Sequence, residues 1–274
     1  MVILVLNCGS SSIKYQVIDM EAASSKLLAK GIVERIGLAE GDLVHKPVGK
    51  EPFELHQPIP DHTTGIRLVL DALTDPKHGV IRSLDEVKAV GHRVAHGGEF
   101  FPTSCIVTEE VKEKIRSLFE IAPLHNPANL EGVLSIEKVL PGVPQVTVFD
   151  TSFHQTIPAV NYLYALPYAY YEKYRVRKYG FHGTSHRYVA RVGAQLAGLD
   201  FENSKIITCH IGNGASVTAV LNGKSFDTSM GFSPLDGLVM GTRCGQVDAS
   251  AITYIGEKEG MSYAELNTMM NKQS

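Results

Sequence analysis

Several short segments of this sequence combine glycine with hydroxyl, cationic or acidic side chains, the groups that hold phosphates and carboxylates. The first, from Asn7 to Lys14, reads NCGSSSIK. Glycine lets the backbone approach a phosphate closely, and hydroxyl, amide and ammonium groups donate hydrogen bonds to its oxygens. The spacing differs from the GxxxxGK[ST] of a Walker A loop, and a strand pattern follows instead of a helix. An ordinary serine-rich hairpin therefore stays open beside a phosphate-binding one.

Two arginines lie between glycines, Arg93 in GHRVAHGG and Arg243 in MGTRCG. The planar guanidinium fork matches a carboxylate or a phosphate, so both arginines are candidates to hold an anion. The segment around Arg93 follows the predicted strand Val87–Val90 and is expected to be a loop at the edge of a cleft. A metal site from His92 and His96 is an alternative, but their spacing suits a helix and this stretch does not resemble one. For Arg243 the alternative is a solvated loop arginine.

An acid and a histidine complete the candidates. Asp150 directly follows the apolar run Gln145–Phe149, and His182 lies between glycines in YGFHGTSH. The carboxyl ends of strands form the ligand-binding edge of α/β folds, so Asp150 is a candidate for metal binding, with a turn cap as the alternative. A Ser–His–Asp hydrolase would need a serine in a GxSxG elbow, which the sequence lacks.

The elements that position these residues follow the order of an α/β protein. An initial antiparallel meander, followed by strands that alternate with helices, predicts a mixed sheet. The predicted strands are Val2–Asn7, Ile13–Asp19, Lys26–Arg35, Val87–Val90, Gln145–Phe149, Lys205–His210, Ser216–Val220 and Phe226–Thr228. The predicted helices are Thr63–Leu73, with Thr63 or Thr64 as N-cap, then Glu109–Glu120, Ser185–Leu196 and Glu265–Lys272.

The two halves of the chain share a pattern. LVLNCGSSSIKYQV and ITCHIGNGASVTAV each contain a strand, a turn of glycine and small polar residues, and a second strand. Gly9 and Gly212 hold matching positions, which indicates an internal duplication. A boundary near Asp150–Gln155 gives domains at 1–150 and 151–274. The second half lacks counterparts of the later helices of the first, so we expect the second domain to be incomplete.

The composition excludes several classes of protein. A chain with 44% hydrophobic and 20% charged residues is typical of a soluble globular protein. The net charge of −3 gives no general attraction to nucleic acid or to an anionic membrane, so a few local arginines must hold an anionic substrate. No secretory signal and no membrane-spanning run is present, which predicts a cytoplasmic location. Without CxxC spacing, reduced thiols are expected at Cys8, Cys105, Cys209 and Cys244.

Taken together, these segments resemble the acetate kinase family. The matching motifs, in the family's order and at its spacings along the whole chain, are NCGSSSIKYQVID, GHRVAHGGE, APLHNPANL, VFDTSFHQT, RKYGFHGTSH, TCHIGNGAS and DTSMGFSPLDGLVMGTRCG. The resemblance implies duplicated ribonuclease-H-like domains of the sugar kinase, heat-shock ATPase and actin superfamily. It further implies that the family's sequence continues past Ser274, with part of the nucleotide site in that continuation, so we expect weak or no turnover from this chain alone.

The resemblance also implies an activity and its partners. The reaction is a reversible, Mg²⁺-dependent phosphoryl transfer between ATP and acetate, giving ADP and acetyl phosphate, with Mn²⁺ as another metal that could serve. A carboxylate is ionised at pH 7 and can attack the γ-phosphorus in line without a general base. The family further implies a homodimer.

Residue roles follow from the same resemblance. Arg93 and Arg243 correspond to the arginines that hold the carboxylate and the phosphoryl group, and His182 to the histidine that stabilises the transition state. Asp150, with Asn7, corresponds to the magnesium site, and His125 lines the cleft. The phosphate- or nucleotide-binding positions are Asn7, Ser10, Ser12, Lys14, His210, Gly212, Asn213 and Gly214. The pocket for the substrate methyl group corresponds to Ala95, Leu124, Phe181 and Pro234.

Three other functions stay open. Acetate-selective members commonly carry valine where this chain has Ala95, and the smaller side chain leaves room for another methylene, which favours propionate kinase as an alternative. A non-catalytic fragment that binds carboxylate or phosphate is a second alternative. A sugar kinase of the same superfamily would need a broader polar pocket than Leu124, Phe181 and Pro234 provide.

Overall fold

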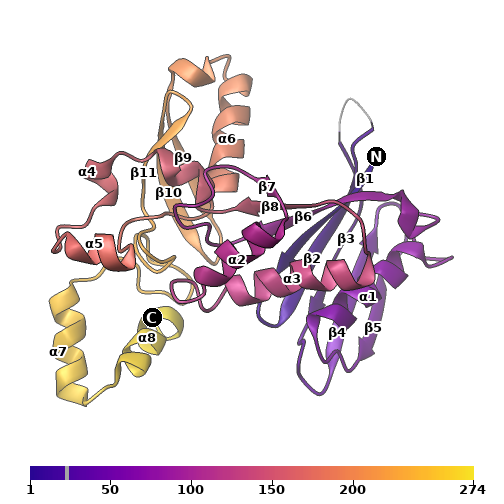
Figure 1. The fold of residues 1–274 in the computed structure, drawn as a ribbon, viewed down its shortest axis with the longest axis horizontal. Helices are drawn as coiled ribbons and strands as arrows, with labels where there is room; N and C mark the ends of the chain where they lie inside the picture. Colours follow the sequence, from indigo (N-terminus) through magenta and orange to yellow (C-terminus); the bar gives the residue numbers. More distant parts are fainter. Residues whose placement is uncertain (22–24) are drawn as a thin grey trace. The chain divides into compact units, whose positions relative to one another are not determined.

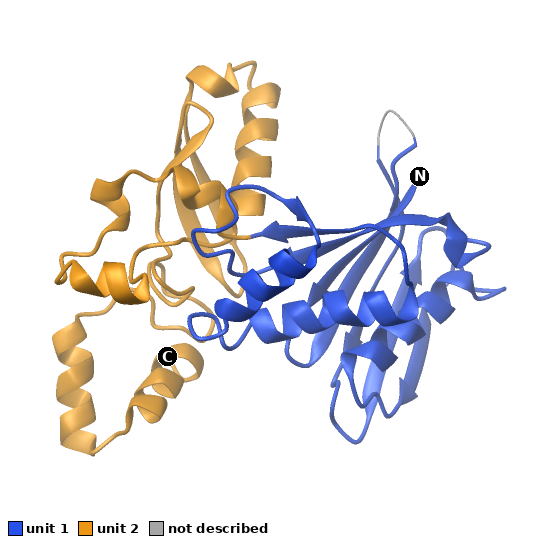
Figure 2. Cartoon of the chain, in the orientation of Figure 1, with its two compact units in different colours: residues 1–149 blue, residues 150–274 orange. Residues whose placement is uncertain are grey.

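The computed structural model describes residues 1–21 and 25–274. The chain divides into two compact units, unit 1 at residues 1–149 and unit 2 at residues 150–274 (Figure 2). Within the described ranges, none of the helices combines the length and the apolar character that crossing a bilayer requires.

Unit 1 is built on a mixed sheet, as the sequence predicted. Among the described residues its strand order is β5-β4-β3-β2-β1-β6-β8-β7. β1 pairs antiparallel with β2 on one side and parallel with β6 on the other, and β6 pairs parallel with β8. The strands are β1 Val2–Cys8, β2 Ser12–Asp19, β3 Lys26–Glu34, β4 Gly41–Pro47, β5 Phe53–Gln57, β6 Val87–Val94, β7 Cys105–Ile106 and β8 Gln145–Phe149. The helices are α1 His62–Thr74, α2 Glu109–Ser117 and α3 Asn126–Val139, with a short 3₁₀ turn, η1, at Leu84–Glu86.

Helices cover one face of this sheet, and that face is apolar. In β1 the alternate residues Val2, Leu4, Leu6 and Cys8 are buried, as the period of two in a strand requires. Helices α1 and α3 pack on the same side of the sheet (Figure 1). The core therefore lies between the sheet and these helices, and the side chains at the odd-numbered positions of β1 point to the opposite face.

The start of α1 corrects one prediction. The N-cap is Asp61, not Thr63 or Thr64, because the Asp61 carboxylate accepts the Thr64 N–H at 2.7 Å. Aspartate is among the best N-caps, and its use starts the helix at His62, one residue earlier than the predicted start at Thr63. Strands β4 and β5 and helix α3 have no counterpart among the predicted elements.

A second correction concerns the segment around Arg93. Strand β6 runs to Val94, so His92 and Arg93 lie within a strand and not in the predicted loop. The neighbouring strands β1 and β8 still pair with β6 in this segment: His92 pairs with Leu6 of β1, and Val94 pairs with Phe149 of β8. Ladder hydrogen bonds on both sides keep the backbone extended even though Gly91 lies within the segment.

Unit 2 contains a three-stranded antiparallel sheet in the order β11-β10-β9 within the described part of the chain. It repeats the antiparallel meander of β1, β2 and β3 with which unit 1 begins, and helix α6 packs on β9. The strands are β9 Lys205–Ile211, β10 Ala215–Leu221 and β11 Lys224–Thr228. The helices are α4 Ala159–Tyr162, α5 Ala169–Tyr174, α6 Gly183–Leu196, α7 Ala249–Glu259 and α8 Tyr263–Lys272, with 3₁₀ turns η2 Ser152–Thr156 and η3 Phe201–Asn203. The predicted α/β class is confirmed.

Candidate active site

The first hairpin turn, between β1 and β2, is held through its backbone. Gly9 N donates to Ser12 O at 2.7 Å, which closes the turn. His62 Nε2 at the start of α1 donates to Gly9 O at 2.7 Å, and Asn129 Nδ2 of α3 donates to Cys8 O at 2.6 Å. The carbonyls are thereby occupied, and the Ser10 hydroxyl at the tip is exposed. The turn thus offers hydroxyls and amide N–H groups from a fixed backbone, as a phosphate-binding hairpin would.

Arg93 and Asn7 meet on the sheet face opposite the helices. Arg93 Nη1 donates to Asn7 Oδ1 at 3.2 Å, and Lys14 lies directly opposite Asn7 in the β1–β2 register. Arg93, Asn7 and Lys14, three predicted site residues of unit 1, therefore lie side by side on the neighbouring strands β6, β1 and β2. The Asn7 amide oxygen is engaged by a guanidinium, so a metal ion bound by Asn7 would compete with Arg93 for it.

His92, beside Arg93 in the strand, points into the core and has a structural role. Its Nε2 donates to Gln145 Oε1 at 2.7 Å, and burial lowers the pKa of His92 to about 4. His96 is also buried; Gly98 N donates to its Nδ1 at 3.0 Å, and burial, aided by His125, lowers the pKa of His96 to about 4. Within residues 1–21 and 25–274 no group of three or more His, Cys, Asp and Glu side chains forms a metal site. These contacts favour the anion-binding interpretation of the segment over the histidine metal site.

Two asparagines of α3 fix the backbone that follows β6, and the sequence reasoning missed both. Asn129 Oδ1 accepts the Ala95 N–H at 2.9 Å while its Nδ2 donates to Cys8 O. Asn126 Oδ1 accepts the His96 N–H at 3.1 Å, and its Nδ2 donates back to His96 O at 2.9 Å. One helix thus connects the first hairpin to the segment after Arg93. The motif APLHNPANL contains both asparagines, but nothing local indicates their partners.

The residues predicted for the methyl pocket are divided between the units. In unit 1, Ala95 is 2% exposed and Leu124 is 61% exposed. In unit 2, Phe181 is buried in a small cluster with Ala215, Met230 and Met240. The Pro234 carbonyl accepts a hydrogen bond from Arg243 Nη1 at 2.9 Å. A pocket formed by all four predicted residues stays a prediction.

Unit 2 brings Arg243 and His182 together over Gly214. A Cβ on Gly214 would lie 3.4 Å from Arg243 Nη1 and 3.5 Å from His182 Cε1 and Nε2. Only a residue without a side chain leaves this space open beside the two donors. The neighbouring Asn213 O accepts the Gly241 N–H at 3.1 Å, which ties the turn after β9 to the segment that carries Arg243. Half-burial lowers the pKa of Arg243, although a guanidinium stays charged at neutral pH.

A hydroxyl orients His182, and this too was missed from the sequence. Ser216 Oγ lies 2.8 Å from His182 Nδ1 and 2.7 Å from His186 Nε2. One hydroxyl proton serves one ring, so Ser216 donates to one histidine and accepts an N–H from the other. Burial, then the neighbouring histidines, lower the pKa of His186 to about 3, so His186 is neutral. Because Ser216 contacts Nδ1 of His182, the other ring nitrogen, Nε2, is on the side of the ring that faces Gly214.

His182 stands in a strained conformation beside His210. Its φ of 59° places a non-glycine residue in the left-handed region immediately before α6. The His182 and His210 rings stack with centroids 4.0 Å apart, and His210 Nδ1 hydrogen-bonds Ser185 Oγ at 2.9 Å. Backbone strain at a residue whose ring is held by two neighbours is typical of a functional position.

Asp150 follows β8 directly and is 3% exposed. Its carbonyl accepts the Gly183 N–H at 2.8 Å, which joins it to the start of α6. Mg²⁺ is commonly bound by one or two carboxylates together with substrate phosphates and waters, and not by an all-protein cage. A single buried carboxylate fits such a substrate-bound ion, so the donor chemistry of Asp150 is compatible with the predicted metal role.

The unit 2 cluster is suited to an anion that carries more than one negative charge. Arg243 supplies a permanent cation, and His182 and His210 supply ring donors. The turn adds the backbone N–H groups of Asn213 and Gly214, since the Gly212 N–H already donates to Gly214 O. Donors fixed in advance stabilise charge that develops on a phosphoryl group without reorganising during the reaction. The Ser216 hydroxyl bonds to His182 and His186, but Ser216 is 0% exposed and cannot reach a substrate, so the described cluster favours transfer to a nucleophile that the substrate brings.

Comparisons with known proteins agree with this chemistry. The model of the acetokinase family matches residues 2–274. Acetate kinase 2 of Clostridium perfringens is 55% identical over 272 residues, 99% of this chain and 68% of that protein. The solved acetate kinase of Porphyromonas gingivalis superimposes with a TM-score of 0.95 at 49% identity, over 100% of this chain and 68% of that chain. A solved propionate kinase from Francisella tularensis gives a TM-score of 0.91 at 42% identity, with the same coverage.

Proposed function

Because the chain belongs to the acetokinase family, we propose that it transfers a phosphoryl group reversibly between ATP and acetate, giving ADP and acetyl phosphate. The observation that carries this proposal is the approach of Arg243 and His182 to the open side of Gly214. It puts a permanent cation and a ring donor within reach of one anionic group, beside the N–H groups of Asn213 and Gly214. A phosphoryl group in transfer is such an anionic group, because negative charge is spread over its oxygens.

The chemistry needs positioning more than proton transfer. A carboxylate oxygen forms the new bond to the γ-phosphorus while the bond from that phosphorus to the bridging oxygen of ADP breaks. The carboxylate is ionised well below neutral pH, so no proton has to leave the nucleophile. Arg243 and His182 neutralise charge on the transferred group, Arg93 holds an anionic oxygen, and the hairpins at Ser10 and Asn213 bind phosphate oxygens.

A divalent metal belongs to this reaction, and Asp150 is the residue proposed to hold it. The bound ion would neutralise phosphate charge and fix the phosphate chain, the roles that such ions have in phosphoryl transfer. Mg²⁺ is the proposed ion, with Mn²⁺ as a second choice of the same coordination chemistry. Asp150 holds its position through the hydrogen bond from Gly183.

The substitution Gly214→Ala tests the proposal directly. The added methyl group fits sterically but fills the space between Arg243 and His182, so kcat/KM should fall about 10²-fold, the cost of displacing a reacting group by about 1 Å. Acetyl phosphate formed from acetate and Mg²⁺–ATP, trapped as the hydroxamate, measures the effect. A rate for this variant equal to that of the wild-type chain, however slow the wild-type chain is, would contradict the proposal.

Gly193→Ala is the matched control. Gly193 lies on the exposed side of α6, and a Cβ there would meet no atom within 4 Å. Alanine in a helix interior is more favourable than glycine by about 0.5–1 kcal/mol, so this variant should be slightly more stable and fully active.

Propionate is the second candidate substrate, on the observation that Ala95 is small, buried and fixed through its N–H. If its methyl group borders the substrate, valine at this position removes room for a methylene, a discrimination of about 1–3 kcal/mol. Ala95→Val should then lower kcat/KM for propionate about tenfold relative to acetate. An unchanged ratio would exclude Ala95 as the residue that sets chain length.

A further inference from the structure

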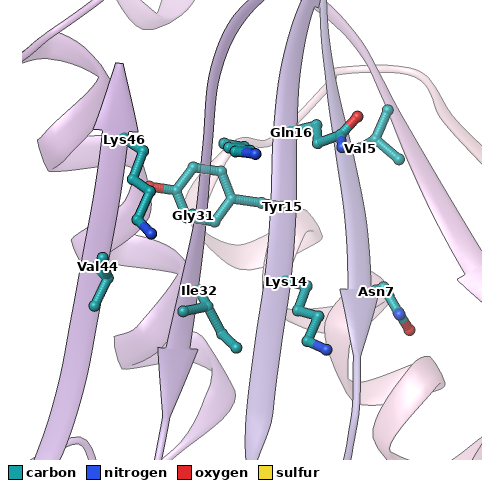
Figure 3. Close-up of a pocket in the computed structure, with 10 residues that line it drawn as sticks. Val5, Asn7, Lys14, Tyr15, Gln16, Gly31, Ile32, Val44 and Lys46 are labelled. Carbon is teal, nitrogen blue, oxygen red and sulfur yellow. The ribbon is translucent and has the colours of Figure 1, made fainter. Parts of the chain in front are cut away.

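The face of the unit 1 sheet opposite α1 and α3 carries a hollow that the proposed function does not explain. It has a volume of about 440 Å³, within the range of small-molecule sites (Figure 3). We call it the basic hollow. Its lining residues are Val5, Asn7, Lys14, Tyr15, Gln16, Lys30, Gly31, Ile32, Val44 and Lys46.

The strand register explains why these residues meet. Alternate side chains of β1, β2, β3 and β4 point away from α1 and α3, so one face collects them. One cross-strand row is Asn7, Lys14, Ile32 and Val44. The next row is Val5, Gln16, Lys30 and Lys46. The hollow lies across both rows; β1 and β4 contribute two lining residues each, and β2 and β3 contribute three each.

The rim of the hollow carries positive charge only. Lys14, Lys30 and Lys46 are exposed, and none of the lining side chains is acidic. In the part of the chain that the structure describes, none of these three lysines makes an ion pair or a side-chain hydrogen bond. Lys30 and Lys46 are directly opposite each other in the β3–β4 register, and like charges in this position destabilise a strand pair. An anion between them would remove that repulsion.

The floor of the hollow is apolar and rigid. Val5, Ile32 and Val44 present aliphatic surface (Figure 3). Tyr15 and Gly31 are opposite each other in the β2–β3 register, and the buried Tyr15 ring occupies the place where Gly31 has no side chain. A Cβ on Gly31 would lie 2.4 Å from Tyr15 Oη and from Val44 O, so no larger residue fits there. The Tyr15 hydroxyl is held by His45 Nδ1 at 2.6 Å. The floor therefore keeps its shape without a ligand.

We propose that the basic hollow binds a small organic anion, one with an apolar body and a phosphate, sulfonate or carboxylate group. The apolar body lies on Val5, Ile32 and Val44, and the anionic group lies between Lys30 and Lys46. The site goes beyond the proposed phosphoryl transfer and shares with it only Asn7 and Lys14. A hollow of about 440 Å³ suits a small molecule better than a long polypeptide segment.

Fluorescence titration of the full chain with anilinonaphthalene sulfonate, an aromatic anion, tests this site. Changing both Lys30→Gln and Lys46→Gln should raise the dissociation constant about tenfold, because two charge-assisted contacts are lost. Lys26→Gln, a change of an exposed lysine on the same strand but outside the hollow, should leave it unchanged. Equal affinity of wild type, double variant and control would overturn the proposal, since the probe would then bind elsewhere.

Competition tests the chemistry of the ligand. Phenyl phosphate should displace the probe, and benzyl alcohol at the same concentration should not; equal displacement by both would show that the lysines play no part. Acetyl phosphate formation by the double variant should be unchanged, because neither Lys30 nor Lys46 belongs to the proposed transfer site. Failure of the anion site and failure of the proposed function therefore give different results.

Discussion

The two glycine hairpins have the same number of residues in their turns but different surroundings. Residues 9–11 join β1 to β2, and residues 212–214 join β9 to β10. In the first, Cys8 pairs with Ile13 and Gly9 N donates to Ser12 O. In the second, Ile211 pairs with Ala215 and Gly212 N donates to Gly214 O. Counted between these closing pairs instead of between the strand ends, the second loop is shorter by one residue.

Their positions in the sheets differ as well. β1 lies between β2 and β6, and its turn is anchored by His62 and Asn129. β9 is the last strand of its sheet in the described part of the chain, and Ile207 and Ile211 are 73% and 72% exposed. The first hairpin is fixed by core packing, whereas the second is placed beside Arg243 and His182. Changes at the first should therefore reduce stability, and changes at the second should reduce turnover.

The largest effect is expected from Arg243→Ala. Loss of a pre-placed cation from the transferred phosphoryl group should lower kcat about 10³-fold, roughly 4 kcal/mol of transition-state stabilisation. The melting temperature should change little, because Arg243 is only half-buried. Arg187→Ala, on the exposed side of α6, is the control and should keep full turnover. An active Arg243→Ala variant would show that the second hairpin is not where the chemistry occurs.

Asn129→Ala should give the largest loss of stability. It leaves the buried Cys8 C=O and Ala95 N–H without their partner, at about 1–3 kcal/mol for each group, so unfolding should be easier by about 3 kcal/mol. Chemical denaturation with urea measures the change. Asn267→Ala, on the exposed surface of α8, should change stability by less than about 0.5 kcal/mol. Equal stability of the two variants would mean that the hydrogen bonds of Asn129 to Cys8 and Ala95 do not stabilise the first hairpin.

Acid should destabilise both units through buried histidines. The pKa is lowered to about 4 in His92 and to about 3 in His186, so the folded form stays neutral where the unfolded chain, with a pKa near 6.5, takes up a proton. Stability is therefore full above pH 6.5 and falls as the pH decreases towards 4, by up to about 1.4 kcal/mol per pH unit for each histidine.

Thermal melts from pH 7.5 to 4.5 measure this loss. His92→Asn in unit 1 and His186→Asn in unit 2 should each flatten the slope, whatever they do to stability at neutral pH. Slopes equal to that of the wild type in both variants would rule out these histidines as the cause.

The smallest effect on stability is expected at the edge of β9. Ile207→Lys puts a charge on an exposed apolar edge strand, the usual protection against edge-to-edge association. The free energy of unfolding should change by less than about 0.5 kcal/mol, while light scattering at high protein concentration should decrease. Leu196→Lys, at the exposed end of α6, is the control and should scatter as the wild type does. A decrease in both variants would mean that overall charge, and not the β9 edge, controls association.

Local patterns were enough to predict much of the fold. The strands β1, β2, β8 and β9 have bounds within one residue of the prediction, because continuous apolar runs end at glycine-containing turns or at a polar residue. The end of β6 was wrong: Gly91 and the polar residues after it suggested a loop, and only the ladders to β1 and β8 keep it extended.

The composition of the motifs alone determined the chemical character of this protein: arginines between glycines, an acid after a buried strand, and turns that can hold phosphate. The tertiary structure decided which of these groups meet. The Arg93 contact to Asn7 and the Asn129 contact to Cys8 join residues 86 and 121 positions apart. Ser216 joins two histidines from another element, and the lysines of the basic hollow meet only through strand register. Such pairs depend on how distant segments pack, and no local pattern of residue types records that.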